Sequence, residues 1–293
     1  MVFEMNPILV HCHIYYPQMW PELKECIHNI EPHPFKLFVT MVEKHPDIWD
    51  DILIDFPNAH IEVVENRGYD IGPFVHIINQ VNLDDYSYVV KLHTKRDIPS
   101  KTDTINDLLL HGPIWRDKLL SPFKNKEIFA KYISAFDTNK TIGMQAHYTL
   151  MVRNDRDEDF STLKKIKIFM RKYAQKSISY SFIAGTMFIA RANIFKRIQQ
   201  FHLSLSDFQT PAKREGELAH VMERIMGYIV YRSGYVCFDG NTSDELQNKF
   251  QKSLPKIKQN KPLLQYFYQK KITKSGKIIV KVCRIPIFIR KVK

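Results

Sequence analysis

The chain has 293 residues, of which 44% are hydrophobic and 25% charged, a composition typical of a globular protein with a substantial core. No apolar stretch reaches the roughly 18 residues that cross a bilayer, and the first residues lack a secretory signal pattern, so we expect a cytoplasmic protein. The net charge of +12 divides into −2 for residues 1–248 and +14 for residues 249–293. The near-neutral body argues against a nucleic-acid binder.

The first hundred residues alternate strand-like and helix-like segments. Apolar runs predict strands over 8–16, 35–42, 61–64 and 86–92, and helical spacing predicts helices over 21–30, 47–55 and 70–81. Strands that alternate with helices of about ten residues imply βαβ crossovers and a mainly parallel sheet. We therefore expect an α/β, Rossmann-type fold with helices flanking the sheet.

The pattern after residue 112 is less regular. It predicts helical structure over 115–136, a strand over 141–146, an acidic loop over 151–160, a strand over 183–191, a helix from about Ala192 and a helix over 215–231. Gly185 lies near the start of its strand, where glycine often marks close approach by a ligand or another backbone. We expect one domain over 1–245, with halves 1–112 and 113–245, and a basic amphipathic tail over 246–293.

Metal-ligand and disulfide spacings are not evident. The four cysteines form no Cys-x-x-Cys pair, so reduced, buried thiols are expected. His11 and His13 would share one face of the first strand, but no acidic residue is near them in the sequence. A structural role is favoured over a metal site for this pair.

The segment that follows the third strand combines polar residues with two glycines. Asn66 and Arg67 precede Gly68, and Asp70 stands where the next helix should begin. Free backbone amides at a helix N-terminus favour phosphate, so this turn is a candidate anion site. Asp70 has the alternative role of a helix N-cap, and Arg67 could contact phosphate or pair with Asp70.

A cationic cluster follows the fourth strand. Extended geometry would put Lys91, His93 and Lys95 on one face, with Arg96 next to them. Such donors could stabilise a diphosphate as it departs, because its charge grows in the transition state. A solvated basic turn is the alternative. Ligands of open parallel sheets bind outside the carboxyl ends of strands, which favours the anion site.

A third candidate cluster lies in the predicted helix over 215–231. His220 and Glu223 are three residues apart and so share a helix face, and Arg224 follows. Glu223 could accept a proton from an attacking hydroxyl, with His220 orienting it. An ordinary surface pair would have the same spacing, and Glu215 and Glu217 are competing candidates for the base.

Together these segments resemble the rhamnan synthesis protein F family of bacterial polysaccharide glycosyltransferases, over about residues 8–235. The resemblance is carried, in order, by Val10 to Tyr16, Asn66 to Phe74, Lys91 to Lys95, Ala184 to Phe188 and Ala219 to Arg224. The order of parts also looks like the glycosyltransferase A fold, with a nucleotide-sugar half followed by an acceptor half. The Asp-x-Asp metal motif of that fold is absent after the fourth strand, so a divalent metal is in doubt and no metal ligand is assigned.

The resemblance implies transfer of a sugar, L-rhamnose or a relative, from a nucleoside diphosphate donor of the dTDP-L-rhamnose type to a growing glycan on a lipid carrier. Glu223 and His220 would then be catalytic. The substrate-binding residues would be Asn66, Arg67, Asp70, Lys91, His93, Lys95, Arg96, Gly185 and Arg224.

The basic tail suits a peripheral place on the inner face of the bacterial membrane. Each Lys or Arg near anionic lipid contributes about 1 kcal/mol, and apolar residues of the tail could insert at the interface. The competing interpretation is a non-catalytic relative that binds glycan or nucleotide and acts as a scaffold in polysaccharide assembly.

Overall fold

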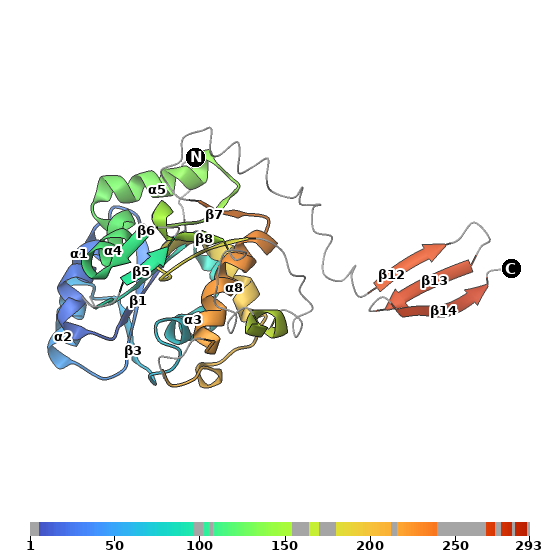
Figure 1. The fold of residues 1–293 in the computed structure, drawn as a ribbon, viewed down its shortest axis with the longest axis horizontal. Coiled ribbons are helices and arrows are strands. Elements are labelled where there is room, and N and C mark those ends of the chain that lie inside the picture. Colours follow the sequence, from blue (N-terminus) through green and yellow to red (C-terminus); the bar gives the residue numbers. More distant parts are fainter. Residues whose placement is uncertain are drawn as a thin grey trace. The chain divides into compact units, whose positions relative to one another are not determined.

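The computed structural model describes residues 6–96, 102–105, 108–153, 164–169, 180–211 and 216–238, and three strands between 268 and 291. By its contacts the chain divides into two compact units, Met1–Thr242 and Ser243–Lys293. All the candidate site residues belong to the first unit. Its helices and strands are labelled in Figure 1.

A seven-stranded sheet forms the centre of the first unit. Its strand order is β11-β7-β10-β4-β1-β2-β3. The strands are β1 (Ile8–Ile14), β2 (Phe35–Met41), β3 (His60–Val63), β4 (Tyr88–His93), β7 (Ile142–Gln145), β10 (Phe188–Arg191) and β11 (Val236–Phe238). Only β10 runs against its neighbours β4 and β7, and the other pairs are parallel. The predicted α/β fold with a mainly parallel sheet is confirmed.

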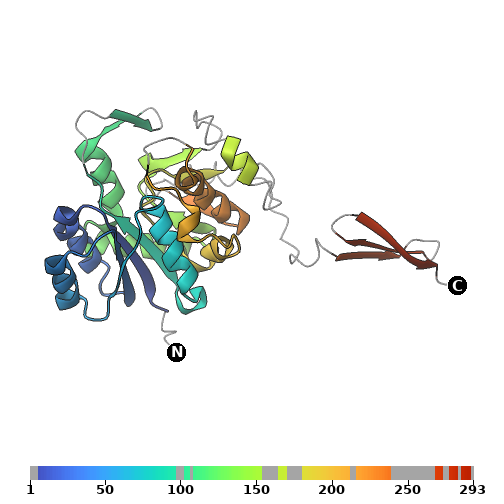
Figure 2. The same cartoon turned by 90° about the horizontal axis from the view of Figure 1, so that it is seen from below.

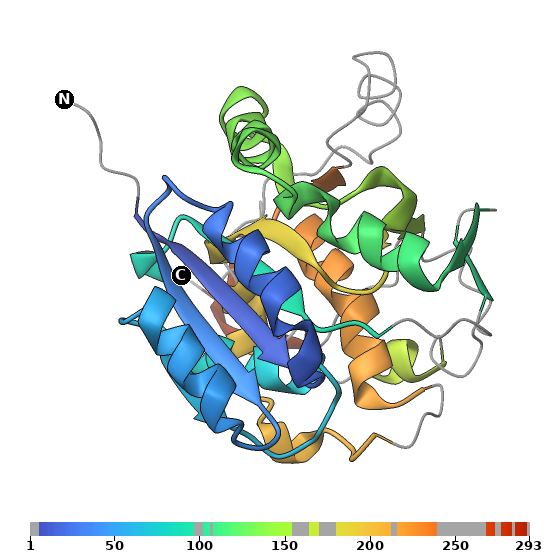
Figure 3. The same cartoon turned by 90° about the vertical axis from the view of Figure 1, so that its left-hand side faces the viewer.

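Helices cover both faces of this sheet. They are α1 (Trp20–His28), α2 (Pro46–Asp55), α3 (Ile71–Gln80), α4 (Gly112–Leu120), α5 (Lys126–Thr138), α7 (Lys196–Gln199) and α8 (Leu218–Arg232). The chain passes from β1 to β2 to β3 in one direction and returns from β3 to β4, so right-handed crossovers place α1 and α2 on one face and α3 on the other. Figure 2 shows this division, and Figure 3 shows α1 and α2 in front of the strands.

The central strands are buried on both faces. All seven residues of β1 and all six of β4 are buried, which explains their almost continuous apolar sequences. Four residues break that run: His11, His13, Lys91 and His93 are polar and buried within these two strands. Buried polar groups need partners, and those partners define the candidate site.

Smaller strand pairs lie outside the main sheet. Strand β5 (Thr102–Ile105) pairs with β6 (Leu108–His111), and β8 (Met151–Arg153) pairs with β9 (Ser181–Ile183). The second unit contains an antiparallel sheet of β12 (Tyr268–Ile272), β13 (Lys277–Val282) and β14 (Ile285–Lys291). Among the described residues, no helix is both long enough and apolar enough to cross a membrane.

Most predicted elements of the first half are confirmed within two residues, and three later ones are wrong in part. The helical region 115–136 is split because Pro122 lacks an amide hydrogen, and Asn125 caps the new helix by accepting from the Ile128 amide at 2.8 Å. The strand over 183–191 is split into β9 and β10 by a turn at Gly185. The acidic loop over 151–160 begins as strand β8, and its residues 154–160 lie outside the described residues.

Candidate functional site

The candidate site lies where the chain leaves two adjacent parallel strands in opposite directions. After β1 the chain goes on to β2, whereas after β4 it goes to the β10 side of the sheet. A crevice outside the carboxyl ends of strands is expected at such a switch point. Here Thr94 joins the two exits: its Oγ1 accepts from the amides of Tyr15 and Tyr16 at 2.9 and 3.0 Å, and its amide donates to the His13 carbonyl at 3.0 Å.

A cluster of Asp70, Lys91 and Thr186, called the clamp below, lies beside these exits. The Lys91 ammonium pairs with Oδ2 of Asp70 and donates to Oγ1 of Thr186 at 3.0 Å. The Thr186 hydroxyl donates to the same Asp70 oxygen at 2.7 Å. The Lys91 side chain is 0% exposed and that of Asp70 is 20% exposed, and the clamp joins β4 to two distant loops.

The clamp holds a fixed pair of charges. Burial alone would raise the pKa of Asp70, but His93 and Lys91 and the hydrogen bonds from Lys91 and Thr186 hold it far below its usual range. Burial lowers the pKa of Lys91, and the Asp70 carboxylate opposes that shift. Burial also lowers the pKa of His93, to about 3, so the ion pair of the clamp at neutral pH is the one between Lys91 and Asp70.

Three of these residues have surroundings that the sequence did not predict. Lys91 is not a free cation because Asp70 neutralises it, and His93 is neutral at physiological pH. Nor does Asp70 cap helix α3 with its side chain, which is occupied in the clamp. His93 still contacts the clamp, with Nδ1 at 3.5 Å from Oδ2 of Asp70, a distance too long for a strong hydrogen bond.

His11 and His13 continue the buried polar network towards β2. Nε2 of His11 and Nδ1 of His13 both lie 2.9 Å from Oγ1 of Thr40. Burial, as the largest cause, lowers the pKa of both rings, that of His13 to about 4. Among the described residues, no group of three His, Cys, Asp or Glu side chains is arranged to hold a metal ion. The structure gives the pair a shared threonine partner.

Two tight turns bring the loops to the clamp, each with two consecutive residues in the left-handed region. Gly68 and Tyr69 have φ of 68° and 55°, and Gly185 and Thr186 have φ of 78° and 51°. Glycine adopts this conformation freely, whereas the β-branched Thr186 does so at an energetic cost. A Cβ at Gly68 would also lie 2.5 Å from the Phe208 ring. The surrounding contacts must hold Thr186 in place.

Helix α8 contributes Glu223, which binds the second turn. Oε1 of Glu223 accepts from the Gly185 amide at 2.8 Å, and Oε2 accepts from Arg224 at 2.6 Å. Gly185 and Glu223 are thus brought together, as are Glu223 and Arg224. His220, one turn earlier, instead packs against Tyr69 with ring centroids 5.7 Å apart. The predicted His220–Glu223 pair faces two different loops.

The other two acidic candidates have different positions. Glu217 is buried at the start of α8, with a residue exposure of 8%. Glu215 lies outside the described residues. Glu223 is therefore the candidate carboxylate with a visible link to the turn at Gly185.

Lys95 and Arg96 differ from Lys91 because they lie beyond the end of β4. Lys95 Nζ lies 4.6 Å from the centroid of the Trp115 ring, and Arg96 lies 5.4 Å from that of Tyr16. Lys95 is half-buried and Arg96 exposed. An aromatic face attracts a cation without neutralising it, so both charges can still meet an anion.

The remaining predicted residues lie on the neighbouring loop. Arg67 pairs with Glu65 at 2.5 Å and donates to the Phe208 carbonyl at 3.0 Å, so it does not pair with Asp70. Asn66 is half-buried beside it. Arg67 thus ties its own loop to the segment that carries Phe208.

A family comparison decides the identity of this domain. The sequence model of the family described as rhamnan synthesis protein F matches residues 1–235, which includes every strand of the seven-stranded sheet up to β10 and the whole of α8. The chain belongs to the rhamnan synthesis protein F family. This confirms the resemblance that the sequence motifs indicated, and it connects the chain with rhamnan and related polysaccharide synthesis.

Two curated relatives of this member of the rhamnan synthesis protein F family are both described as "Uncharacterized protein WxcX", from two strains of Xanthomonas campestris pv. campestris. Each is 30% identical over 180 residues, which are 60% of this chain and 24% of the relative. The matched part thus spans about a quarter of the length of these relatives.

Sequence reasoning about this rhamnan synthesis F domain missed Thr186, Thr40 and Trp115. Thr186 stands within the motif Ala184 to Phe188, but only Gly185 was selected there because glycine has an evident backbone role. A lone threonine or tryptophan carries no such signal. Trp115 packs near Gly185, where an added Cβ would lie 3.2 Å from its Nε1.

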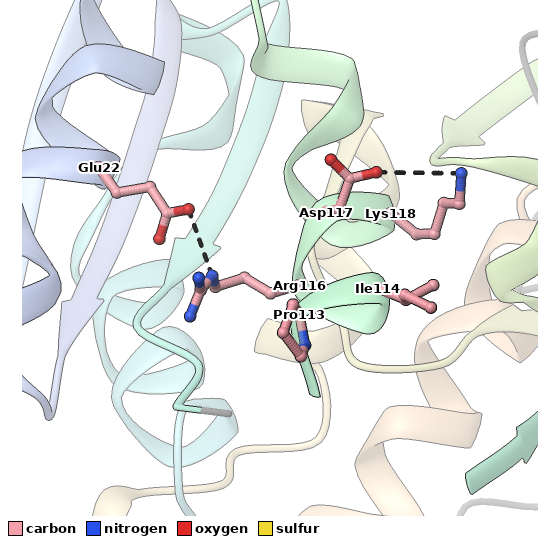
Figure 4. A pocket seen from close by; sticks show the side chains of 6 residues that line it. All are labelled: Glu22, Pro113, Ile114, Arg116, Asp117 and Lys118. Atoms are coloured by element: carbon pink, nitrogen blue, oxygen red, sulfur yellow. Dashed lines mark ion pairs between the residues drawn. The ribbon is translucent and has the colours of Figure 1, made fainter. Parts of the chain in front are cut away.

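A pocket of about 510 Å³ lies between α1 and α4 (Figure 4). It is lined by Glu22, Pro113, Ile114, Arg116, Asp117 and Lys118. Arg116 pairs with Glu22 at 3.2 Å. None of the lining residues was predicted as a site residue.

Proposed function

We propose that this domain is a glycosyltransferase that moves a sugar, L-rhamnose or a relative, from a nucleoside diphosphate donor to a growing cell-surface polysaccharide. The observation that supports it best is the meeting of the β1 and β4 exits, with Lys95 and Arg96 carrying positive charge beside aromatic rings. Family membership supports the reaction class, since it connects the chain with polysaccharide synthesis.

In the proposed reaction, an acceptor hydroxyl attacks the anomeric carbon of the donor sugar. The new bond joins the hydroxyl oxygen to that carbon, the bond from the carbon to the diphosphate oxygen breaks, and the nucleoside diphosphate leaves with the bonding electrons. Glu223 would accept the hydroxyl proton. Lys95 and Arg96 would stabilise the charge that grows on the leaving diphosphate.

The donor in this proposal is of the dTDP-L-rhamnose type and the acceptor a glycan on a lipid carrier. Such an acceptor lies at the inner membrane surface, and the 14 positive charges of residues 249–293, without one acidic residue, would favour an anionic surface. The unit Ser243–Lys293 would then hold the enzyme peripherally at that surface.

One observation favours the second candidate, a non-catalytic scaffold that binds nucleotide or glycan. Both oxygens of Glu223 accept internal hydrogen bonds, from Gly185 and from Arg224. A carboxylate oxygen can accept a second hydrogen bond, so these contacts leave room for an acceptor hydroxyl. In a scaffold the same contacts would serve only to fix the turn.

A screen of nucleotide sugars for hydrolysis and transfer, with and without a chelator, separates the two candidates. We expect transfer from a deoxysugar nucleotide by the wild-type protein and a loss of at least about 100-fold in Glu223→Gln, the usual size of a general-base contribution. Glu217→Gln is the matched control and should stay within a few-fold of wild type. Donor binding without any turnover would instead support the scaffold.

A further inference from the structure

We propose that Thr186 is a positioning residue: its hydroxyl fixes the Gly185 turn to Asp70 and Lys91, and the turn in turn aims Glu223 into the crevice. This inference rests on the proposed function for its catalytic consequence. It replaces the expectation that Asp70 and Lys91 bind substrate. The clamp would hold the site's geometry without touching the donor.

The hydroxyl of Thr186 uses its hydrogen and a lone pair within the clamp. It donates to Asp70 at 2.7 Å and accepts from Lys91 at 3.0 Å, and Thr186 is 3% exposed. Two charge-assisted hydrogen bonds on one hydroxyl are stronger than neutral ones and set its direction. A serine could make the same two bonds, whereas a valine of the same shape could make neither.

The backbone of Thr186 shows why the turn needs this hold. Its φ of 51° is one that β-branched residues rarely adopt, and the preceding Gly185 has φ of 78°. Residues in such conformations persist only where their surroundings over-determine them, and they gather at functional sites. The bonds from Thr186 to Asp70 and Lys91 supply that constraint.

The turn at Gly185 also fixes the orientation of Glu223, the proposed base. Gly185 directly precedes Thr186, and its amide donates to Oε1 of Glu223 at 2.8 Å. The other side of the same turn packs on helix α4, with Leu119 and Trp115 close to Gly185. A shift of Thr186 would therefore move the hydrogen bond that holds Glu223.

Lys91 lies too deep to bind a donor, and the Asp70 carboxylate, whose side chain is 20% exposed, is anionic and would repel the donor diphosphate. Lys91 is 0% exposed, and its Nζ lies 5.6 Å from the centroid of the Phe74 ring. Its ammonium is already bonded to Asp70 and Thr186. Lys95 and Arg96, beyond the end of β4, are the cations placed to meet a donor. The clamp therefore has a positioning role.

The test compares Thr186→Val with Thr186→Ser in steady-state transfer by the full chain. We expect kcat of the valine variant to fall about 100-fold, because a small misplacement of a reacting group costs about that much, with donor KM within about twofold of wild type. The serine variant should stay within about threefold of wild type. Thr149→Val is the matched control, since Thr149 is buried and its hydroxyl bonds His147 instead.

A second readout does not depend on activity. Amide hydrogen exchange at Gly185 should be at least about tenfold faster in Thr186→Val than in wild type and in Thr186→Ser, while the amides of β1 and β4 keep their rates. An unchanged exchange rate at Gly185 would overturn the proposal that the clamp holds this turn. Faster exchange with an unchanged kcat would overturn the proposal that the turn orients Glu223. A wild-type protein without transfer would reject the proposed function, and exchange alone would then decide the clamp.

Discussion

Two halves of one segment, Lys91 to Arg96, have opposite surroundings. Lys91 and His93 lie inside β4, the strand between β1 and β10, and both are buried. Lys91 is ion-paired with Asp70, and His93 is neutral. Lys95 and Arg96 follow two residues later, next to aromatic rings, and keep their charges. Four residues that look alike in sequence therefore divide into a structural pair and a pair that can bind an anion.

The strand end explains the difference. All six residues of β4 are buried, and Lys91 is paired with β1 on one side and with β10 on the other, so a charge there needs a partner or a shift to the neutral form. Strand β4 ends at His93, and the side chains of Lys95 and Arg96 beyond it are accessible to water. The anion-binding role therefore belongs to the exit of the strand and not to the whole segment.

The largest expected effect is on stability. Lys91→Met leaves the Asp70 carboxylate without its cation, and breaking a buried pair in this way costs about 3 kcal/mol or more. Lys95→Met removes a contact with Trp115 worth at most about 1 kcal/mol. Denaturant unfolding of both variants measures the contrast. Equal losses would contradict the division between the two pairs.

A pH effect should follow from the buried histidines. Between pH 6.5 and about 4 an unfolded histidine binds a proton, whereas folded His13 and His93, with pKa values lowered to about 4 and about 3, stay neutral. Stability should thus fall as the pH drops through this window, by about 1.4 kcal/mol per pH unit for each ring. At pH 5 that is about 2 kcal/mol per histidine relative to pH 7.5.

Unfolding free energies at pH 7.5, 6 and 5 check this expectation. His13→Asn cannot titrate at this position, so its stability should depend less steeply on pH than that of the wild type. The lowered pKa of Asp70 adds nothing in this window, because a normal aspartate is already ionised above about pH 4. A flat profile would mean that the rings can be protonated in the folded protein.

The smallest expected effect concerns the donor. Lys95→Gln and Arg96→Gln should each weaken binding of a nucleoside diphosphate about tenfold, the loss of one charge-assisted hydrogen bond, while unfolding free energies change by less than about 1 kcal/mol. Isothermal titration with the free diphosphate measures it. Lys118→Gln, in the pocket beside α4, is the control and should leave affinity unchanged. An equal loss there would indicate a diffuse basic surface.

The fold was predictable because its signals are local. Apolar runs predicted β1, β2 and β4, and helical spacing predicted α1 and α2. For the site, the sequence predicted which segments take part but not which side chains contact one another. The burial of Lys91, the choice of Asp70 as its partner and the role of Thr186 depend on residues 21 and 116 positions from Asp70, a long-range pairing that spacing cannot reveal.

The most direct test of the central claim is a side-by-side measurement of kcat and donor KM for Lys95→Gln and Thr186→Val. We expect Lys95→Gln to raise the donor KM and also to lower kcat, since it removes a cation that binds the diphosphate and stabilises its growing charge. We expect Thr186→Val to lower kcat with the donor KM nearly unchanged, since it misplaces the base. The contrary result, a raised KM in Thr186→Val with normal kinetics in Lys95→Gln, would place the donor on the clamp and reject the division proposed for this segment.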